Sequence, residues 1–313
     1  MTKRTTWGVL LLNFGGPKTL EDVEPFLTHI LGSRRVSPEM VSAAKKRYHA
    51  IGGGSPLLSI TKLQTAKLER ELNLEGDRYR VYIGMLHAHP FIFDTMKQMA
   101  SEGVERIFVL TLAPFYSRFS TGAYYTAVKN ALEELHYYVP VEFAKPWYSH
   151  PLFIQAMAQR INRFLQEQAN WEEGYLVFSA HSLPIGSNDG DVELYCRHFQ
   201  ETVELITQKL NHCKYRIAYQ SRGGNRGKWL EPDILEVIES LWQEGERHII
   251  IIPAGFVSDH VETLYDLDID LKSQARNQGI RFQRCPALND DPFFIQALAS
   301  IITGQVGNGV VLK

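Results

Sequence analysis

Short hydrophobic runs recur along the chain and alternate with stretches in which apolar residues follow a helical period. Continuous apolar runs of this length are typical of strands buried on both faces of a parallel sheet. Strands are predicted at residues 7–12, 79–84, 106–112, 141–145, 175–179, 215–219, 248–253 and 280–284, with amphipathic helices at 59–73, 90–103, 150–168 and 232–246. This alternation predicts the α/β class with doubly wound sheets.

The predicted strands fall into two sets of four that resemble each other. The third strand of one set runs into APFYSRFSTG (113–122) and that of the other into PAGFVSDHVET (253–263), so that Phe115 aligns with Phe256. We interpret this as a weak internal repeat. It predicts two similar domains, residues 1–145 and 146–313, each with a four-stranded parallel sheet, facing each other across a cleft. Open α/β sheets bind ligands beyond the carboxyl ends of their strands, so the loops there should line that cleft.

Composition excludes several classes of protein. The chain has 313 residues, of which 44% are hydrophobic and 22% charged, and its formal net charge is −2, as in a soluble globular protein. No block of lysine and arginine suggests a nucleic-acid surface. The widely spaced Cys196, Cys213 and Cys285 form no CxxC pair, which fits a reducing cytoplasm. No apolar run reaches the ~20 residues of a membrane span, but peripheral attachment stays open.

His181 ends the strand-like run YLVFSAH (175–181), where an α/β protein usually opens its active site. A single histidine is commonly a hydrogen-bonded structural residue. At the carboxyl end of a strand, however, an imidazole could take a proton near neutral pH or bind a transition metal. His87 and His89 alternate along extended chain and would point to opposite faces, which disfavours chelation by both.

The stretch SDHVETLYDLDID (258–270) carries carboxylates at a helical spacing. Glu262, Asp266 and Asp270 recur every four residues and would form one line on a helix. A capping box with Asp259 as N-cap and Glu262 at N3 would explain the first acids. It does not explain the later ones, since like charges on one helix face repel each other. A line of oxygen ligands for a cation explains the excess better.

Two glycine-rich loops, NFGGP (13–17) and IGGGSP (51–56), lack the spacing of phosphate-binding loops. Ser55 either caps a helix with Pro56 at its first position or presents its hydroxyl to an anionic ligand. Aromatic residues such as Phe14, Tyr48 and Tyr124 would pack in a core or form walls for a flat aromatic ligand.

The chain resembles the ferrochelatases, enzymes that insert ferrous iron into a porphyrin in haem synthesis. The resemblance is carried by the ordered motifs LLNFGGP, RYHAIGGGSPL, YIGMLHAHP, LAPFYSRFSTGAYY, FSAHSLP, YQSRGGNRGKWLEPD and PAGFVSDHVETLYDLDID, which span nearly the whole chain. It implies two Rossmann-like, chelatase-type domains with the porphyrin in the cleft between them, and lyase activity on porphyrin and Fe²⁺. It also implies that a C-terminal helix near 293–304 packs on the first domain.

The resemblance also assigns site residues. By the SAHSLP and HVETLYD matches, His181 and Glu262 correspond to the catalytic, metal-binding histidine and its carboxylate partner. We expect the imidazole and the acid to converge from opposite halves of the molecule. Asp266 and Asp270 fall on an outward acidic series that serves as a secondary cation path. The porphyrin-contact positions correspond to Phe14, Arg47, Tyr48, Ser55 and Tyr124.

Departures from the family pattern bear on the substrate. Members that act on coproporphyrin III commonly have tyrosine where this chain has Phe14, and arginine where it has Leu31 and Gly32, although Arg34 and Arg35 lie close by. We therefore favour protoporphyrin IX, with coproporphyrin III as the alternative. A family iron–sulfur cluster needs four cysteines and the chain has three, so no cluster and no permanently bound cofactor is expected.

Other functions stay open from the sequence. A protein that carries a tetrapyrrole or a metal without chemistry, and a chelatase for another metal such as cobalt, would share these features. The expected setting is the cytoplasm, with no nucleic-acid partner. An iron donor protein and peripheral membrane contact are compatible with the sequence.

Overall fold

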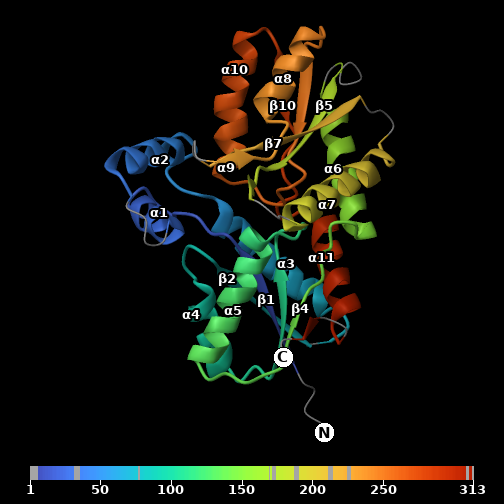
Figure 1. Cartoon of the computed structure of the whole chain (residues 1–313). Coiled ribbons are helices and arrows are strands. Elements are labelled where there is room, and N and C mark those ends of the chain that lie inside the picture. The colour runs from blue at the N-terminus through green and yellow to red at the C-terminus, as the bar shows by residue number, and fades with distance from the viewer. Residues whose placement is uncertain are drawn as a thin grey trace. The chain divides into compact units, whose positions relative to one another are not determined.

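The computed structural model describes residues 6–31, 36–76, 78–168, 170, 174–186, 190–210, 214–223, 227–307 and 310–311. The chain forms two compact units (Figure 1). Unit 1 comprises Met1–Trp147 and Asn289–Lys313, and unit 2 comprises Tyr148–Leu288. The boundary expected near residue 145 lies close to this division. Residues from 289 onward, which the expected boundary put in the second domain, belong to unit 1, on which the family resemblance placed the helix near 293–304.

The sheet of unit 1 contains every strand predicted for the first set. β1 (Trp7–Asn13), β2 (Tyr79–Met85), β3 (Arg106–Thr111) and β4 (Val141–Phe143) are parallel. A short strand that was not predicted, β11 (Val310–Val311), pairs antiparallel with β4 and gives the order β11-β4-β3-β1-β2. β1 lies between β3 and β2 and is buried along its apolar run.

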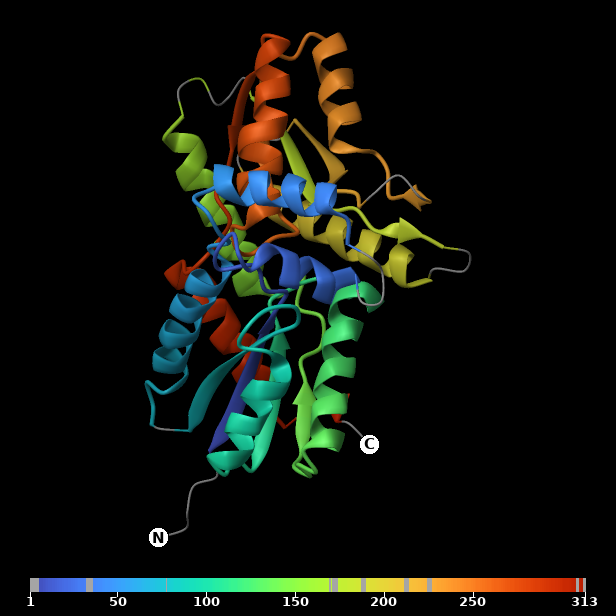
Figure 2. The same cartoon turned by 90° about the vertical axis from the view of Figure 1, so that its left-hand side faces the viewer.

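Helices cover both faces of this sheet. α4 (Ile92–Ser101) and α5 (Ala123–Glu134) pack on one face, where Met96 and Val128 share a core with Leu10 and Val109. α3 (Leu57–Leu72) and α11 (Pro292–Gln305) pack against each other on the other face (Figures 1 and 2). α1 (Val23–Leu31) and α2 (Pro38–Ala50) lie side by side, and a π-helical turn, η1 (Arg118–Gly122), precedes α5.

Unit 2 repeats this architecture. β5 (Tyr175–His181), β7 (Tyr215–Gln220), β9 (His248–Ile252) and β10 (Arg281–Arg284) are parallel, in the order β10-β9-β5-β7. α8 (Ile234–Gln243) and α10 (Lys272–Asn277) cover one face, and α6 (Pro151–Gln166) and α7 (Gly190–Thr207) the other (Figure 1). β6 (Pro184–Ile185) and β8 (Lys228–Trp229) form a small antiparallel ribbon.

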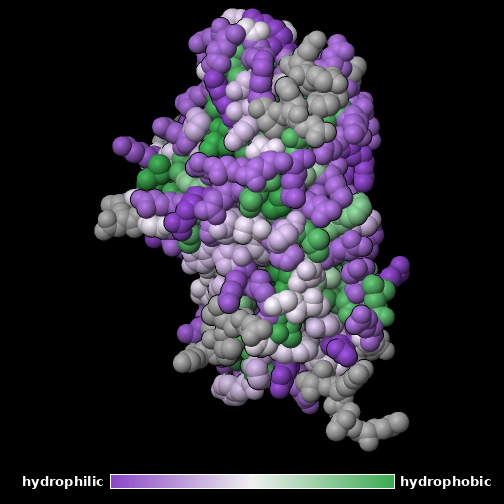
Figure 3. All heavy atoms as spheres, turned by 90° about the vertical axis from the view of Figure 1, so that its right-hand side faces the viewer, coloured by the Kyte–Doolittle hydropathy of each residue, from purple (hydrophilic) through white to green (hydrophobic). Residues whose placement is uncertain are grey.

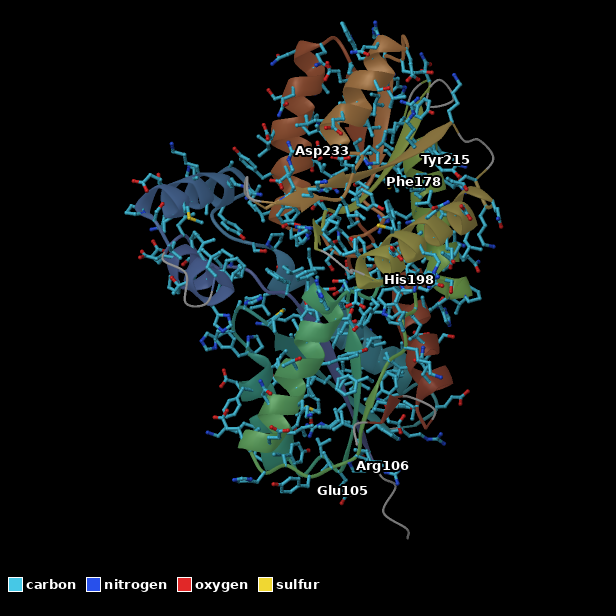
Figure 4. The ribbon with its side chains drawn as sticks, in the orientation of Figure 1. Glu105, Arg106, Phe178, His198, Tyr215 and Asp233 are labelled. Atoms are coloured by element: carbon cyan, nitrogen blue, oxygen red, sulfur yellow. The ribbon has the colours of Figure 1, made fainter. Side chains whose placement is uncertain are left out.

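α8 illustrates how the sequence builds these layers. Its apolar residues recur at i, i+3, i+4 and i+7, and these side chains are buried against the sheet. The N-cap Asp233, labelled in Figure 4, accepts a hydrogen bond from the Leu235 amide at 2.9 Å, and Glu236 accepts one from the Asp233 amide at 3.2 Å. This capping box starts the helix where the sequence predicted it. On the neighbouring strands, Phe178 and Tyr215 pack edge to face, 5.8 Å between ring centroids.

The two sheets share one connectivity. Numbering the parallel strands of each unit along the chain gives the order 4-3-1-2 in both. The second and third strands therefore lie on opposite sides of the first, which creates a topological switch point between the first and third strands. Ligands of doubly wound sheets bind beyond the carboxyl ends at such a point. In unit 2 that point lies between β5 and β9.

Hydrophilic residues dominate the face of the molecule in Figure 3, with hydrophobic residues in smaller groups among them. Among the described residues, no helix combines the length and the hydrophobicity that crossing a membrane requires.

Candidate metal centre

His181 is the last residue of β5, at the switch point of unit 2. Its Nδ1 lies 2.5 Å from the Ser182 carbonyl oxygen. A carbonyl can only accept, so Nδ1 carries the proton of this bond, and Nε2 is directed to another group. The side chain is 34% exposed. The strand end thus holds the imidazole in one orientation with Nε2 presented to its neighbours.

Glu262 provides that neighbour. It lies in α9 (Val261–Leu264), the short helix that follows β9, and its Oε1 is 3.4 Å from His181 Nε2. Two ligands at about 2.1 Å from a tetrahedral or octahedral metal lie roughly 3.0 to 3.4 Å apart. The pair is therefore spaced as two ligands of one ion would be. Both residues belong to unit 2, so the expectation that they come from opposite halves of the molecule is wrong.

The pKa of His181 reflects two opposing effects. Desolvation lowers it, but the Glu262 carboxylate outweighs this by its charge and hydrogen bond, with smaller help from the Ser182 carbonyl and Asp266. The result is a pKa raised from 6.5 to about 9. At neutral pH the ligand-free pair is consequently an imidazolium facing a carboxylate, and a metal that binds Nε2 has to displace a proton.

The segment around Glu262 differs from the predicted regular helix. The N-cap of α9 is His260, whose amide donates to Thr263 Oγ1 at 3.0 Å, so the alternative of a capping box between Asp259 and Glu262 is wrong. α9 is followed by a π-helix, η3 (Asp266–Leu271), in which the Asp270 amide donates to the Tyr265 carbonyl, five residues back, at 2.9 Å. π-helical turns occur frequently at functional sites.

The acidic residues of this segment differ in exposure, and Asp270 is the exposed one. The Glu262 side chain is 29% exposed, Asp266 is half-buried and Asp270 is exposed. Asp266 Oδ2 accepts a hydrogen bond from Ser221 Oγ at 2.7 Å, and Asp270 Oδ1 accepts one from Gln274 Nε2 at 3.1 Å. Glu262 and Asp266 are thus partly buried, whereas Asp270 reaches solvent.

A second imidazole flanks the pair. His260 Nε2 lies 4.0 Å from Glu262 Oε2, and the His260 ring packs edge-on against Phe256. In the described part of the chain, no three histidine, cysteine, aspartate or glutamate side chains are arranged to hold a metal. His181 and Glu262 are therefore a pair that could supply two ligands to one ion.

The predicted porphyrin contacts all belong to unit 1. Phe14 is 39% exposed and its ring centroid lies 4.6 Å from that of His87. Tyr48 is buried, with its ring edge-on to Phe26, which in turn meets Phe14. The His87 Nδ1 also lies 2.9 Å from the Nδ1 of His29, and burial followed by the charge of His29 lowers the pKa of His87 to about 4. Phe14 thus forms the exposed edge of an aromatic cluster.

The other predicted contacts vary in exposure. Ser55 Oγ accepts from the Leu57 amide at 3.3 Å, and a Cβ added at Gly16 would come within 2.7 Å of that oxygen. The glycine therefore permits close approach of the two loops. Arg47 is half-buried on α2, whereas Tyr124, on α5, is buried in the core. The positions that bear on the choice of porphyrin, Gly32, Arg34 and Arg35, lie outside the described residues, and Leu31 ends α1.

Comparison with known proteins decides the family. The ferrochelatase family model matches residues 6–306, nearly the whole chain. The chain belongs to the ferrochelatase family. A ferrochelatase of Geotalea daltonii is 36% identical, over 99% of this chain and 100% of its own length. A coproporphyrin III ferrochelatase of Oceanobacillus iheyensis is 38% identical, over 94% and 95%.

Solved structures agree on the fold of this ferrochelatase family member. SirB from Bacillus subtilis, solved with Fe³⁺, aligns over 97% of this chain and 98% of its own chain. The TM-score is 0.59 and the sequence identity 14%. DR2241 from Deinococcus radiodurans, described as structurally similar to chelatases, covers 95% of the chain and 55% of its own with a TM-score of 0.50. The two doubly wound units are therefore of the chelatase type.

The sequence did not identify the residues that anchor the segment around Glu262. Gln220, Ser221 and Arg284 contact the segment that carries Glu262 or its acidic neighbours. The sequence did contain a signal for the first two. Gln220 and Ser221 are polar residues at the end of an apolar strand, as His181 is. Arg284 had none, since its partners lie far from it in the sequence.

Proposed function

We propose that this protein is a lyase that inserts Fe²⁺ into a porphyrin, with protoporphyrin IX as the substrate and no permanently bound cofactor. The observation that carries the proposal is the 3.4 Å separation of His181 Nε2 and Glu262 Oε1 at the switch point of unit 2. Membership of the ferrochelatase family supports the choice of metal and macrocycle.

The ligand pair suits transient binding of iron. Fe²⁺ is of borderline softness, so one imidazole and one carboxylate hold it, whereas a thiolate set would bind too tightly to release it. Two protein ligands leave positions on the ion for water at first and for pyrrole nitrogens later. His181 and Glu262 are the proposed metal ligands and catalytic residues.

The same pair balances the protons of the reaction. Insertion of Fe²⁺ into a free-base porphyrin releases two pyrrole protons. As the ion leaves His181 and Glu262, each side chain can take up one proton. The two protons then replace the two positive charges of Fe²⁺. The ionised Glu262 raises the pKa of His181 and so favours uptake of one proton by the imidazole, while the second proton leaves Glu262 toward solvent and restores its carboxylate. The next Fe²⁺ then displaces the imidazole proton.

We propose Asp266 and Asp270 as the secondary path by which protons leave the centre and cations approach it. Their carboxylates continue from Glu262 toward solvent, and Asp266 already acts on the pKa of His181. A series of carboxylates can pass protons outward or attract a cation inward. On the porphyrin side, we propose Phe14, Arg47, Tyr48, Ser55 and Tyr124 as contacts of the macrocycle.

Coproporphyrin III is the second candidate substrate. Relatives named coproporphyrin III ferrochelatases are as similar to this chain as those named ferrochelatases. The phenylalanine at position 14 favours protoporphyrin IX, because its exposed ring offers apolar contact and no metal-binding oxygen. We place the reaction in the cytoplasm, with an iron donor protein and peripheral membrane contact as compatible partners.

The test of the reaction is anaerobic insertion of Fe²⁺ by the purified protein. His181→Ala should reduce turnover to background, while quenching of porphyrin fluorescence shows that the macrocycle still binds. His198→Ala is the matched control, because His198 is a buried imidazole of unit 2 that stacks on Tyr148 outside the centre. Wild-type turnover by His181→Ala would reject the assignment, and binding without any turnover by the wild type would indicate a carrier.

The choice of porphyrin is tested in the same assay. Protoporphyrin IX should give a kcat/KM at least about tenfold above that of coproporphyrin III, since its vinyl groups replace two charged propionates that apolar surface cannot accommodate. The reverse preference would make coproporphyrin III the substrate without affecting the metal centre.

A further inference from the structure

We propose that Gln220 is a positioning residue that sets the spacing between His181 and Glu262. The inference rests on the proposed function, in which this spacing determines how the pair holds a metal ion. Gln220 contacts neither the metal nor the porphyrin in this scheme. It acts by joining the strand that ends in His181 to the main chain of Glu262.

The backbone of Gln220 is tied to the His181 strand. Gln220 is the last residue of β7 and the register partner of His181 on β5. Its carbonyl oxygen accepts a hydrogen bond from the Ser182 amide at 2.8 Å. Ser182 is the residue whose own carbonyl fixes the His181 imidazole. Gln220 thus holds the main chain directly after His181.

The side chain of Gln220 reaches the other ligand. Its Nε2 donates to the Glu262 carbonyl oxygen at 3.0 Å, and its Oε1 accepts from Ser179 Oγ on β5 at 2.6 Å. Nε2 also lies 3.3 Å from Ser221 Oγ, the hydroxyl that donates to Asp266. One side chain therefore links β5, the Glu262 main chain and the first acid of the outward series.

The chemistry of this position requires an amide. The Glu262 carbonyl can only accept, so the group that faces it has to be a donor, and this fixes the orientation of the amide. Gln220 is 1% exposed and Ser179 is fully buried, so water cannot easily replace either bond. A methionine would fill the same space without a donor and would leave the Glu262 carbonyl without this partner.

The expected consequence is a loss of metal affinity. Residues that orient metal ligands typically contribute a factor of about 10–100 to metal affinity or activity. In Gln220→Met, α9 loses its bond to the sheet beside His181, so the distance between Nε2 and Oε1 is held less tightly. We expect a 10- to 100-fold weaker affinity for Zn²⁺ and a similar fall in kcat. The KM for porphyrin should stay within about twofold of the wild type, because the proposed porphyrin contacts lie in unit 1.

Calorimetry measures Zn²⁺ binding to the full chain without porphyrin. The binding assigned to the centre is the component that disappears in His181→Ala. Gln220→Met is compared with Gln283→Met. Gln283 is also an amide on a strand of this sheet, and it bonds His248 Nε2 at 2.7 Å and Gln168, away from the centre. Gln220→Asn, which keeps an amide but shortens its reach, is the second variant in case the methionine variant does not fold.

The outcomes separate this inference from the proposed function. A Zn²⁺ affinity that falls at least tenfold in a Gln220 variant but less than threefold in Gln283→Met supports it. Similar affinities for the two methionine variants at similar Tm overturn it, and then Gln220 serves stability only. A wild type that binds Zn²⁺ through His181 but inserts no iron would refute the proposed function, while the comparison of variants still decides the role of Gln220.

Discussion

The 3.4 Å ion pair between the partly buried side chains of His181 and Glu262 controls which protonation state the imidazole adopts. Desolvation alone would make the imidazole neutral, and the carboxylate reverses that preference. Folding raises the pKa of His181, so the folded state favours the protonated imidazole. The contribution of this ion pair to the free energy of unfolding is therefore complete below pH 6.5 and is lost as the pH rises through about 9. Metal binding should strengthen over the same range, since fewer protons then compete for Nε2.

Glu262→Gln tests this balance at the level of one atom pair. The amide keeps the size of the side chain but removes its charge, so the pKa of His181 should fall from about 9 to its ordinary value or below. Titration of the imidazole by NMR measures this directly, with Glu244→Gln as a control on an exposed acid of the same unit. The loss of unfolding free energy between pH 6.5 and 9 should also shrink, by on the order of 1 kcal/mol after solvent screening. An unchanged pKa would contradict the role given to Glu262.

The segment from Asp259 to Leu271 is held to the sheet at both ends by one arginine. Arg284 on β10 has a side chain that is only 6% exposed. It donates to Asp259 Oδ1 at 2.7 Å and to both oxygens of Asp268, at 2.9 and 2.6 Å. Asp259 also accepts from Thr263 Oγ1. The turn before α9 and the π-helix after it are therefore fixed by the same guanidinium, with Glu262 between them.

Arg284→Met should show how much this clamp contributes. Removing the cation leaves two acids near each other in a largely buried place, which should lower the free energy of unfolding by about 3–5 kcal/mol. Arg216→Met is the control, because Arg216 forms a similar fork with Glu244 at 2.8 Å but in solvent, where such pairs contribute about 0–1 kcal/mol. Denaturation in urea gives both values, and amide exchange in η3 should quicken only in Arg284→Met. Equal losses for both variants would show that the clamp is dispensable.

The sequence predicted the residues of this segment better than its geometry. Glu262, Asp266 and Asp270 were singled out because a capping box could not account for three acids on one helix. The π-helix was not foreseen, since its register depends on tertiary contacts such as that of Asp268 with Arg284. Local spacing identifies which side chains are unusual, whereas partners distant in sequence determine where they point.

At the scale of the whole chain, the two units are built by one topological rule. Apolar period alone located every parallel strand of both sheets, because strands covered on two faces leave a continuous hydrophobic signal. It did not reveal β11, whose few residues carry too little pattern. The hydrophobic pattern also could not decide to which unit α11 belongs, because the hydrophobic residues of this helix suit either unit. In the structure these residues pack on α3, and Gln64 of α3 bonds the Asn289 carbonyl at 2.7 Å.

Leu298→Ala therefore should destabilise unit 1 alone. Leu298 lies on α11 and is fully buried, so its truncation should cost about 2–5 kcal/mol. Hydrogen exchange followed by mass spectrometry should show weaker protection of β1 and β3 and unchanged protection of β5 and β7. Leu241→Ala, at a fully buried position of α8, should give the opposite pattern. Equal loss of protection in both sheets after either change would mean that the units unfold together.

The return of the chain to unit 1 after residue 288 affects the order in which the protein matures on the ribosome. Unit 2 has all its strands and helices once residue 288 has emerged, whereas unit 1, although translated first, lacks α11 until later. Domains generally fold as units during synthesis. The half that carries His181 and Glu262 can thus acquire its structure while the earlier half still exposes the apolar side of α3 that α11 will cover.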